Sequence, residues 1–307
     1  MAVTGSGTVA NPWMVHDYYE IKDTIGNIGN NQYIKLANDI DCRDYGTAWK
    51  WETIEAATYQ NNYTFDLDGH TIKNLTIAND NLLFSGFINS DQIIKNGVIK
   101  NVFNDRCQRI MNAMTMNNIG MSVNINNIPN SAFGLTKIDC CAIRLEAITL
   151  GQAVFKYRPG YIRNSDFLIN INGNNEHAIF ESDTNITDPI TGCRVVGTIA
   201  NCTPVVTEST GNDTVGLIGN ATDSVISLSF PDAATGARIL LFSKTAQPKG
   251  TIVDMEKLLD TEGDIDFRYT GIITCATHEM DASIGFTNPT ADVALNNKGF
   301  AVAKVGD

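Results

Sequence analysis

Charged residues are scarce in this chain, and basic residues are scarcer than acidic ones. Its 307 residues include 22 Lys+Arg and 34 Asp+Glu, so the charged fraction is 18% and the formal net charge is -12. A field of that sign repels phosphate backbones and anionic membrane surfaces. We therefore expect no nucleic-acid partner.

Long apolar runs are also missing. No uninterrupted apolar stretch reaches the roughly 18 residues of a membrane span, so we expect no membrane insertion. The opening MAVTGSGTVANPWMV has no basic region followed by an apolar run, which is the pattern of a secretory signal. We expect a product that folds in the cytoplasm of the cell that makes it.

Metal-binding and redox motifs are absent as well. The four histidines are widely separated, and no Cys-x-x-C spacing, phosphate-binding loop or dinucleotide fingerprint occurs. We expect no cofactor and no metal. The seven cysteines are interpreted as reduced, mostly buried small hydrophobes: Cys42, Cys107, Cys140, Cys141, Cys193, Cys202 and Cys275.

Glycine and asparagine, in contrast, are abundant, and 43% of the residues are hydrophobic. This composition favours β-structure with many tight turns over a helical bundle. One short helix is predicted after Asp17, which forms a capping pattern with Glu20, because Tyr18, Ile21 and Ile25 then share one helical face. Strands are predicted over 32–42, 49–54 and 63–77.

One sequence motif recurs between about Phe65 and Phe230: an apolar cluster, a turn, and a polar residue that leads into alternating apolar residues. The spacing of its anchor positions is even at first and lengthens in the last two periods. Two short strands in about 22 residues suit one turn of a parallel β-helix, in which each coil pairs with the next. The anchors are Asn74, Asn96, Asn118, Cys141, Asn164, Gly192 and Asp223.

The predicted organisation has three parts. Residues 1–60, with Trp13, Trp49 and Trp51, are expected to cap the first coil, because an open terminal coil would invite unwanted strand pairing. Residues 61–230 form a β-helix of about seven coils. Residues 231–307 lose the period and are expected to form a β-rich cap or attachment domain, with strands at 237–243, 265–276 and 299–305 and a helix at 253–260.

The anchor asparagines have a structural explanation. Asparagine tolerates left-handed backbone at the corners of coils, and stacked amides hydrogen-bond to one another. The two longest periods are expected to eject loops near Asp183–Pro189 and Cys202–Asp213, which are natural contact sites.

The segments GSGTVANPWMV, NQYIKLANDID, WETI and FDLDGHTIKNLTI resemble the opening of right-handed parallel β-helix proteins of the GLUG-repeat kind. LFSGF, AFGL and VGLIG match that repeat loosely, and IKNLTI and IKNGVI match it well. The resemblance covers about residues 5–230 and implies an architecture rather than a chemistry. Proteins of this kind are bacterial adhesins or appendages of tailed phages, and the missing export signal favours the phage.

Enzymes built on this fold have recognisable signatures, which are not found in this chain. The nearest approach is Gly69-His70-Thr71, where a corner histidine bonded to its backbone is the better interpretation. Acidic residues on adjacent coils could still pair as in glycosidases, and Glu146 with Asp166, or Glu181 with Asp183, are the candidates.

Two further features allow more than one interpretation. The acidic stretches DLDG (66–69) and DTEGDID (260–266) could offer oxygen ligands to calcium, although solvated turns are the better interpretation. Tyr157, Tyr161 and Phe167, expected on the outer faces of the coils, could stack on sugar rings or pack against another subunit.

We therefore expect a structural virion protein: a β-helical spike, fibre or tail appendage that contacts the host surface or neighbouring virion proteins. A homotrimer is expected, because one interface then serves all subunits. A tailspike that cleaves host glycan, and a head fibre or capsid decoration protein, are the alternatives. No catalytic residue is assigned.

Overall fold

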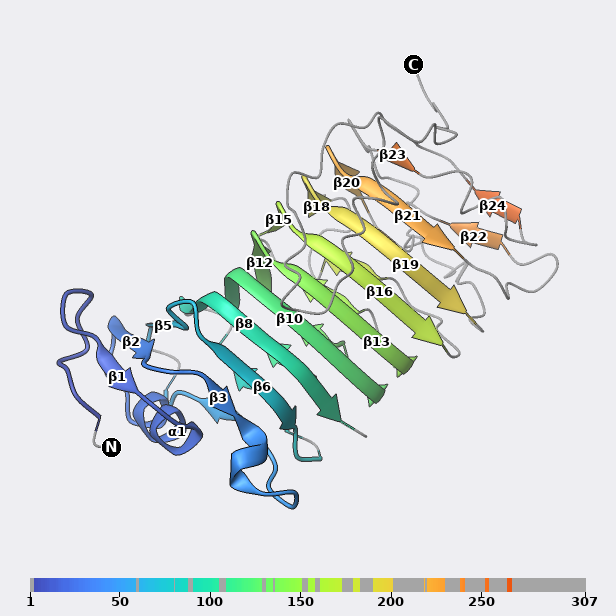
Figure 1. The fold of residues 1–307 in the computed structure, drawn as a ribbon. Helices are drawn as coiled ribbons and strands as arrows, with labels where there is room; N and C mark the ends of the chain where they lie inside the picture. The colour runs from blue at the N-terminus through green and yellow to red at the C-terminus, as the bar shows by residue number, and fades with distance from the viewer. Residues whose placement is uncertain are drawn as a thin grey trace.

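The computed structural model describes most of the chain up to residue 229 and a few short segments beyond it. The described residues are 3–58, 61–79, 81–87, 91–104, 109–128, 131–134, 136–150, 154–157, 161–172, 179–182, 190–200, 218, 220–229, 238–240, 252–253 and 264–266. They form an all-β structure, as the composition predicts, and it is built around a large parallel sheet (Figure 1). Among them, no helix is long and apolar enough to cross a membrane.

The first part of the chain holds the one α-helix among these residues, α1 (Tyr18–Gly26). Asp17 caps it by accepting a hydrogen bond from the Glu20 backbone N–H, and the helix buries Tyr18, Ile21 and Ile25, all as predicted. The other elements here are β1 (Trp13–Val15), β2 (Gln32–Leu36), β3 (Ile40–Asp41), the 3-10 helix η1 (Cys42–Tyr45) and β4 (Ile54–Glu55).

In the described part of the chain the large sheet has sixteen strands, and its main path runs β1-β2-β5-β8-β10-β13-β16-β19-β21-β23. The strands beyond β2 on this path are β5 (Tyr63–Asp66), β8 (Gln92–Asn104), β10 (Thr115–Ile128), β13 (Ala142–Leu150), β16 (Asp166–Asn172), β19 (Arg194–Ala200), β21 (Val225–Ser229) and β23 (Ile252–Val253). Beside it lie β3, β6 (Thr71–Thr76), β12 (Lys137–Asp139), β15 (Ile162–Arg163), β18 (Ile190–Thr191) and β20 (Ala221–Thr222).

A second sheet has, among the described residues, six short strands in the order β17-β14-β11-β9-β7-β4. Its members beyond β4 are β7 (Phe84–Ser85), β9 (Met111–Asn112), β11 (Phe133–Gly134), β14 (Phe155–Tyr157) and β17 (Phe180–Ser182). These strands lie in the recurring apolar clusters of the sequence, and the chain visits the two sheets in turn. A separate pair, β22 (Arg238–Leu240) and β24 (Asp264–Asp266), is also parallel.

The register of the parallel pairs reproduces the period of the sequence. Thr115 lies opposite Ile93 and Gly120 opposite Ala142, so in both pairs the partners are one short period apart. The interval is longer between the partners Asp166 and Arg194. Because each strand pairs with a strand one period earlier, side chains of successive periods form straight columns across the strands.

The core lies between the two sheets. One inward column of the large sheet contains Ile72, Ile99, Met121, Ile143, Phe167, Val195 and Ile226, which are all fully buried. From the second sheet, Phe155 stacks between Phe133 and Phe180, with ring centroids 4.8 and 4.9 Å apart. Stacked aromatic and aliphatic columns of this kind bury most of the apolar surface in the repeating region.

The strand pairing crosses the positions at which the sequence suggested domain boundaries. Strand β2 pairs with β5, and β23, beyond residue 231, pairs with β21. Three other predictions fall mostly or wholly outside the described residues: the helix at 253–260, apart from Val253, the strand at 265–276, apart from residues 265–266, and the strand at 299–305.

Candidate functional site

The most regular polar feature is a corner at which the chain bends into the large sheet. Within the long strands β8 and β10 the bend falls at Asn96 and Asn118, which have φ of 56° and 52°. By strand register the same corner continues through later periods at Cys140, Asn164, Gly192 and Asp223, all with positive φ. Asparagine and glycine tolerate this left-handed conformation better than other residues.

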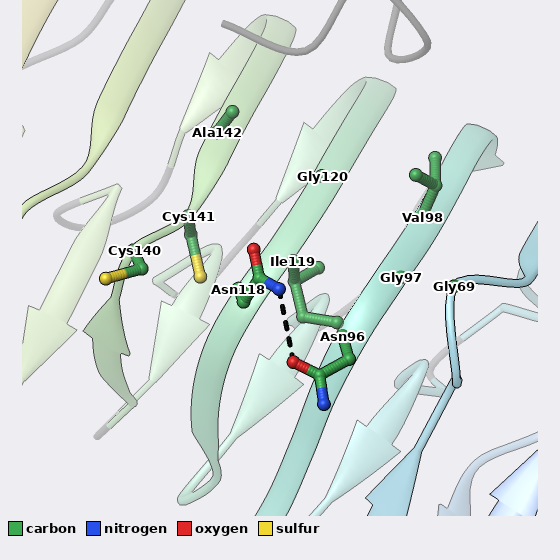
Figure 2. A pocket seen from close by; sticks show the side chains of 10 residues that line it. All are labelled: Gly69, Asn96, Gly97, Val98, Asn118, Ile119, Gly120, Cys140, Cys141 and Ala142. Carbon is green, nitrogen blue, oxygen red and sulfur yellow. Dashed lines mark hydrogen bonds between the residues drawn. The ribbon is translucent and has the colours of Figure 1, made fainter. Parts of the chain in front are cut away.

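The side chains at this corner bind one another. The Asn118 amide nitrogen donates to Asn96 Oδ1 at 3.1 Å, and the Asn96 amide donates to Asp66 Oδ1 at 3.2 Å. Figure 2 shows the first of these bonds, with Cys140 at the corner between β12 and β13. Because Cys140 has no amide, the ladder is interrupted there. On the far side, Asn164 donates to Asp139 Oδ1 at 3.1 Å.

Two of the predicted anchors were assigned to the wrong positions. Asn74 does not align with Asn96: its partner is Asn101, whose amide donates to Asn74 Oδ1 at 2.9 Å across β6 and β8. These two residues form a second left-handed corner. In the fourth period the corner residue is Cys140, whereas Cys141 is buried in the core. The other anchors lie where they were predicted.

A shallow groove of about 330 Å³ runs beside this corner. Small residues, Gly97, Gly120 and Ala142, are among those that line it (Figure 2). A Cβ atom at Gly97 would lie 2.4 Å from Leu67 Cβ, so a larger residue there would displace the neighbouring turn. Burial, together with the Asp139 carboxylate, raises the pKa of the Cys140 thiol above its ordinary value, so this thiol is protonated at neutral pH and a poor nucleophile.

His70 lies at a turn of the first periods and is bonded to an acidic side chain. Its Nδ1 is 3.2 Å from Asp39 Oδ1, which also accepts from the Thr71 backbone N–H at 3.0 Å. The backbone N–H and carbonyl of His70 bond to Leu67 and Val98. The Gly69-His70-Thr71 motif therefore serves to hold the turn in this structure.

The predicted carboxylate pair Glu146–Asp166 is not brought together. Asp166 lies opposite Ala142, and Glu146 lies four residues further along that strand, which separates them by roughly 13 Å. A glycosidase requires a separation of at most about 10 Å. Asp166 is instead fully buried and paired with Arg194 through two bonds of 2.9 and 2.8 Å.

Of the second candidate carboxylate pair, Glu181 and Asp183, the structure describes only Glu181. Glu181 lies in β17 opposite Lys156. Asp183 lies outside the described residues, as do the predicted loops 183–189 and 202–213.

The acidic stretch 66–69 is occupied by protein donors. Asp66 is buried and accepts hydrogen bonds from the Tyr33 hydroxyl and the Asp68 backbone N–H, and Lys35 binds the Asp68 carboxylate at 2.7 Å. No group of three or more potential metal ligands occurs among the residues that the structure describes. Of the stretch 260–266, only the residues of β24 are described.

The described cysteines are free thiols, as predicted. Cys42, Cys141 and Cys193 are buried, and Cys140 is half-buried. Burial raises the pKa of each of the three buried thiols to about 12. They act as small core residues. Cys107, Cys202 and Cys275 lie outside the described residues.

The prediction for Phe167 was wrong. It lies in an inward column, is fully buried, and packs 4.9 Å from Phe155 and 5.1 Å from Phe180 between ring centroids. Tyr161 is half-buried beneath the Arg163 guanidinium, which lies 4.0 Å from its ring centroid. Tyr157 belongs to β14.

Sequence reasoning missed a set of outward side chains on the large sheet. Phe103 and Ile148 are 48% and 52% exposed, and both line hollows on the outer face. Alternation along β13 carries the signal that could have identified Ile148, because it falls on the same side as Arg144 and Glu146. In β8 the left-handed bends at Asn96 and Asn101 break the alternation, so the sequence carries no such signal for Phe103.

No protein-family model matches this chain, and neither a curated protein nor a solved structure is similar to it at a significant level.

Proposed function

We propose that this chain is a structural protein of a phage particle, folded as a right-handed parallel β-helix of about seven coils. It acts by contact, as a spike, fibre or tail appendage that meets the host surface or neighbouring virion proteins. The observation that carries this proposal is the regular return of the chain to two parallel sheets, with each strand added to the strand one period earlier. A stack of this kind forms an extended scaffold with long outer faces.

Three aspects of the described residues support contact over turnover. Corner amides bind one another, His70 is bonded to Asp39, and Asp166 is neutralised by Arg194. These polar groups stabilise the stack. The assignment to a phage rests on the resemblance of residues 5–230 to GLUG-repeat β-helices.

A homotrimer is part of the proposal. Closed three-fold symmetry lets one surface patch serve every subunit, and flat outer faces of stacked strands suit such packing. Sedimentation equilibrium of the full chain should give the mass of three subunits at micromolar concentration. A monomer under those conditions would count against the trimer.

The location of the protein tests the proposed function directly. Antiserum against the full chain, visualised with gold in electron micrographs of purified particles from the producing culture, should label one fixed part of the virion. Label on the head would identify a head fibre or decoration protein, whereas label on the tail would identify a tail appendage. Absence of label from particles, with the protein recovered elsewhere in the culture, would overturn the proposal.

A turnover assay separates contact from cleavage. The full chain is incubated with capsular and cell-wall polysaccharide of the host, and reducing ends are measured over time. The contact proposal expects no increase. A steady release of reducing ends would replace it with a glycan depolymerase.

A further inference from the structure

A groove crosses the outer face of the large sheet over β8, β10, β13, β16 and β19, which lie side by side (Figure 1). It consists of two adjoining hollows of about 280 and 520 Å³ that share Asn124 and Glu146. We call it the outer-face groove. It lies on a different part of the strands from the corner of Figure 2, and none of the functional candidates from the sequence except Glu146 lines it.

The strand register arranges the groove side chains in rows that cross the strands. The first row contains Phe103, Asn124, Glu146, Asn170 and Thr198, which are successive register partners. The second row lies two residues further along the strands and contains Asn126, Ile148, Asn172 and Ala200. Within a row, neighbouring side chains start about 4.8 Å apart, so a linear ligand along the row would meet a similar set of groups at each strand.

Neutral amides dominate the polar part of the groove. Each amide offers both a donor and an acceptor. The two charged side chains in the groove neutralise each other, because Arg144 Nε donates to Glu146 Oε1 at 2.9 Å. The lining therefore suits a ligand that is rich in hydroxyl groups and has no net charge.

The lining also contains two large apolar side chains that are exposed to solvent. Phe103 and Ile148 are half exposed, and they are two of the four large hydrophobic residues exposed in the described part of the chain. Each lies within a polar row. A sugar ring presents both an apolar C–H face and hydroxyl edges, so it matches an exposed aromatic or aliphatic side chain flanked by amides. Of the large hydrophobic residues exposed in the described part of the chain, only Phe103 and Ile148 lie in the groove, which is less than the apolar core of a permanent subunit interface.

We propose that the outer-face groove binds a neutral glycan chain, which lies across the strands from β8 to β19. The inference rests on the proposed function, because it assigns a ligand class and a site to the contact with the host surface. Phe103 and Ile148 pack against sugar rings, and Asn124, Asn126, Asn170 and Asn172 bond to hydroxyl groups.

Binding of defined sugars by the full chain tests the proposal. The probes are hexasaccharides of cellulose, laminarin, amylose, mannan and chitin, with oligogalacturonate as the anionic comparison, measured by calorimetry and by saturation-transfer NMR. At least one neutral probe should bind, and Phe103→Ala and Ile148→Ala should each weaken that binding by tenfold or more. Binding of the anionic probe alone would overturn the proposal, and so would binding of no probe.

Two further variants separate a lost contact from a damaged fold. Asn170 Oδ1 accepts a hydrogen bond from the Thr198 backbone N–H at 3.2 Å, and Asn170→Asp keeps this acceptor while it removes the amide donor. It should weaken glycan binding by about fivefold with an unchanged melting temperature. Tyr19→Ala, which removes an exposed aromatic ring far from the groove, should leave binding unchanged. Equal losses in the groove variants and in Tyr19→Ala would contradict the assigned site.

The outcomes also distinguish this inference from the proposed function. A chain that binds a neutral probe through the groove but is not found on particles would support the glycan site and overturn the phage role. A chain located on the virion whose groove variants bind the probes as tightly as the wild type would overturn the site alone. If Phe103→Ala converts a sedimenting oligomer to a monomer, the groove is an interface between copies, and the glycan proposal fails.

Discussion

The start of the chain, residues 3–58, and the repeating region between 61 and 229 achieve burial in different ways. In the first, an aromatic cluster is held by individual contacts. The ring centroid of Tyr18 lies 4.8 Å from that of Trp49 and 4.9 Å from that of Trp51. Trp51 Nε1 also donates a hydrogen bond to the Leu83 carbonyl at 2.8 Å. In the second, columns of aliphatic and phenylalanine side chains repeat from strand to strand. We call residues 3–58 the closure, because they lie at the end of the sheet, and the repeating region between 61 and 229 the stack.

The difference follows from the position of each region. A strand inside a parallel stack has neighbours on both sides, whereas the first strand has an open edge that must be covered. Here the backbone of Met14, in β1, bonds to Thr4, and α1 packs beside β1 and β4. Stability of a stack is close to a sum over neighbouring repeats, so a defect in the middle affects both sides and a defect at the end remains local.

The largest expected effect comes from removing an aromatic side chain in the middle of the stack. Phe155 is buried and stacked between Phe133 and Phe180, so Phe155→Ala should lower the free energy of unfolding by about 4 kcal/mol. Trp51→Ala removes a ring of at least that size from the closure. Urea unfolding, combined with hydrogen exchange, measures both variants.

The pattern of amide hydrogen exchange in the two variants compares the closure with the stack. Amides of β10, β13 and β16 should lose protection in Phe155→Ala, whereas in Trp51→Ala the loss should be confined to residues 3–58 and their partners in β5, β6 and β7. The same pattern in both variants would show that the closure and the stack unfold as one unit, which would remove the distinction between them.

A buried ion pair gives the next effect. Arg194 and Asp166 are 3% and 0% exposed and share two hydrogen bonds, so Arg194→Met leaves a buried carboxylate without its guanidinium and should cost about 3 kcal/mol. The double variant Asp166→Leu with Arg194→Met should recover most of that loss. A double variant no more stable than Arg194→Met would show that the pair itself stabilises this part of the stack.

Acid should weaken both regions through different carboxylates. Hydrogen bonds from Arg43 and Asn74 hold the pKa of Asp41 below its ordinary value. Burial raises the pKa of Asp139, but bonds from Arg163 and Asn164 outweigh it and lower that pKa.

A carboxylate with a lowered folded-state pKa contributes stability above its unfolded pKa, near 4, and this stability is lost as the pH falls further. Weakening of the bonds from Arg163 and Asn164 to Asp139 should cost on the order of 1 kcal/mol. Melting temperatures between pH 5 and pH 2 should fall less steeply in Asp139→Asn than in the wild type. Parallel curves would contradict the inferred linkage.

The smallest expected effect is a gain in the free energy of unfolding. Cys140 has φ of 53° and interrupts the amide ladder between Asn118 and Asn164. Cys140→Asn places a residue that favours this conformation in the gap and adds a bond to the ladder, so stability should rise by about 1 kcal/mol. Cys140→Ala, which lacks both features, is the matched control. A gain of equal size in the alanine variant would show that removal of the thiol, not the amide, is responsible.

Local patterns in the sequence correctly predicted the helix cap at Asp17, the period of the strands and the left-handed corners at Asn96, Asn118 and Asn164. These patterns failed where the register between strands determines which residues become partners. The spacing between Asn74 and Asn96 equals the period by coincidence, because the bend in β8 lets this strand pair with both β5 and β6, and the true partner of Asn74 is Asn101.

The sequence alone determined that the chain forms short strands in a repeating order, because alternation, turn residues and period are local properties. Only the tertiary structure decided which face of a strand points inward, which buried Phe167 and exposed Phe103. It also decided which residues of different periods become neighbours, separating Glu146 from Asp166 and joining Asp166 to Arg194. A one-position shift in register moves every side chain to the opposite face, and register is set by contacts between segments that are distant in the chain.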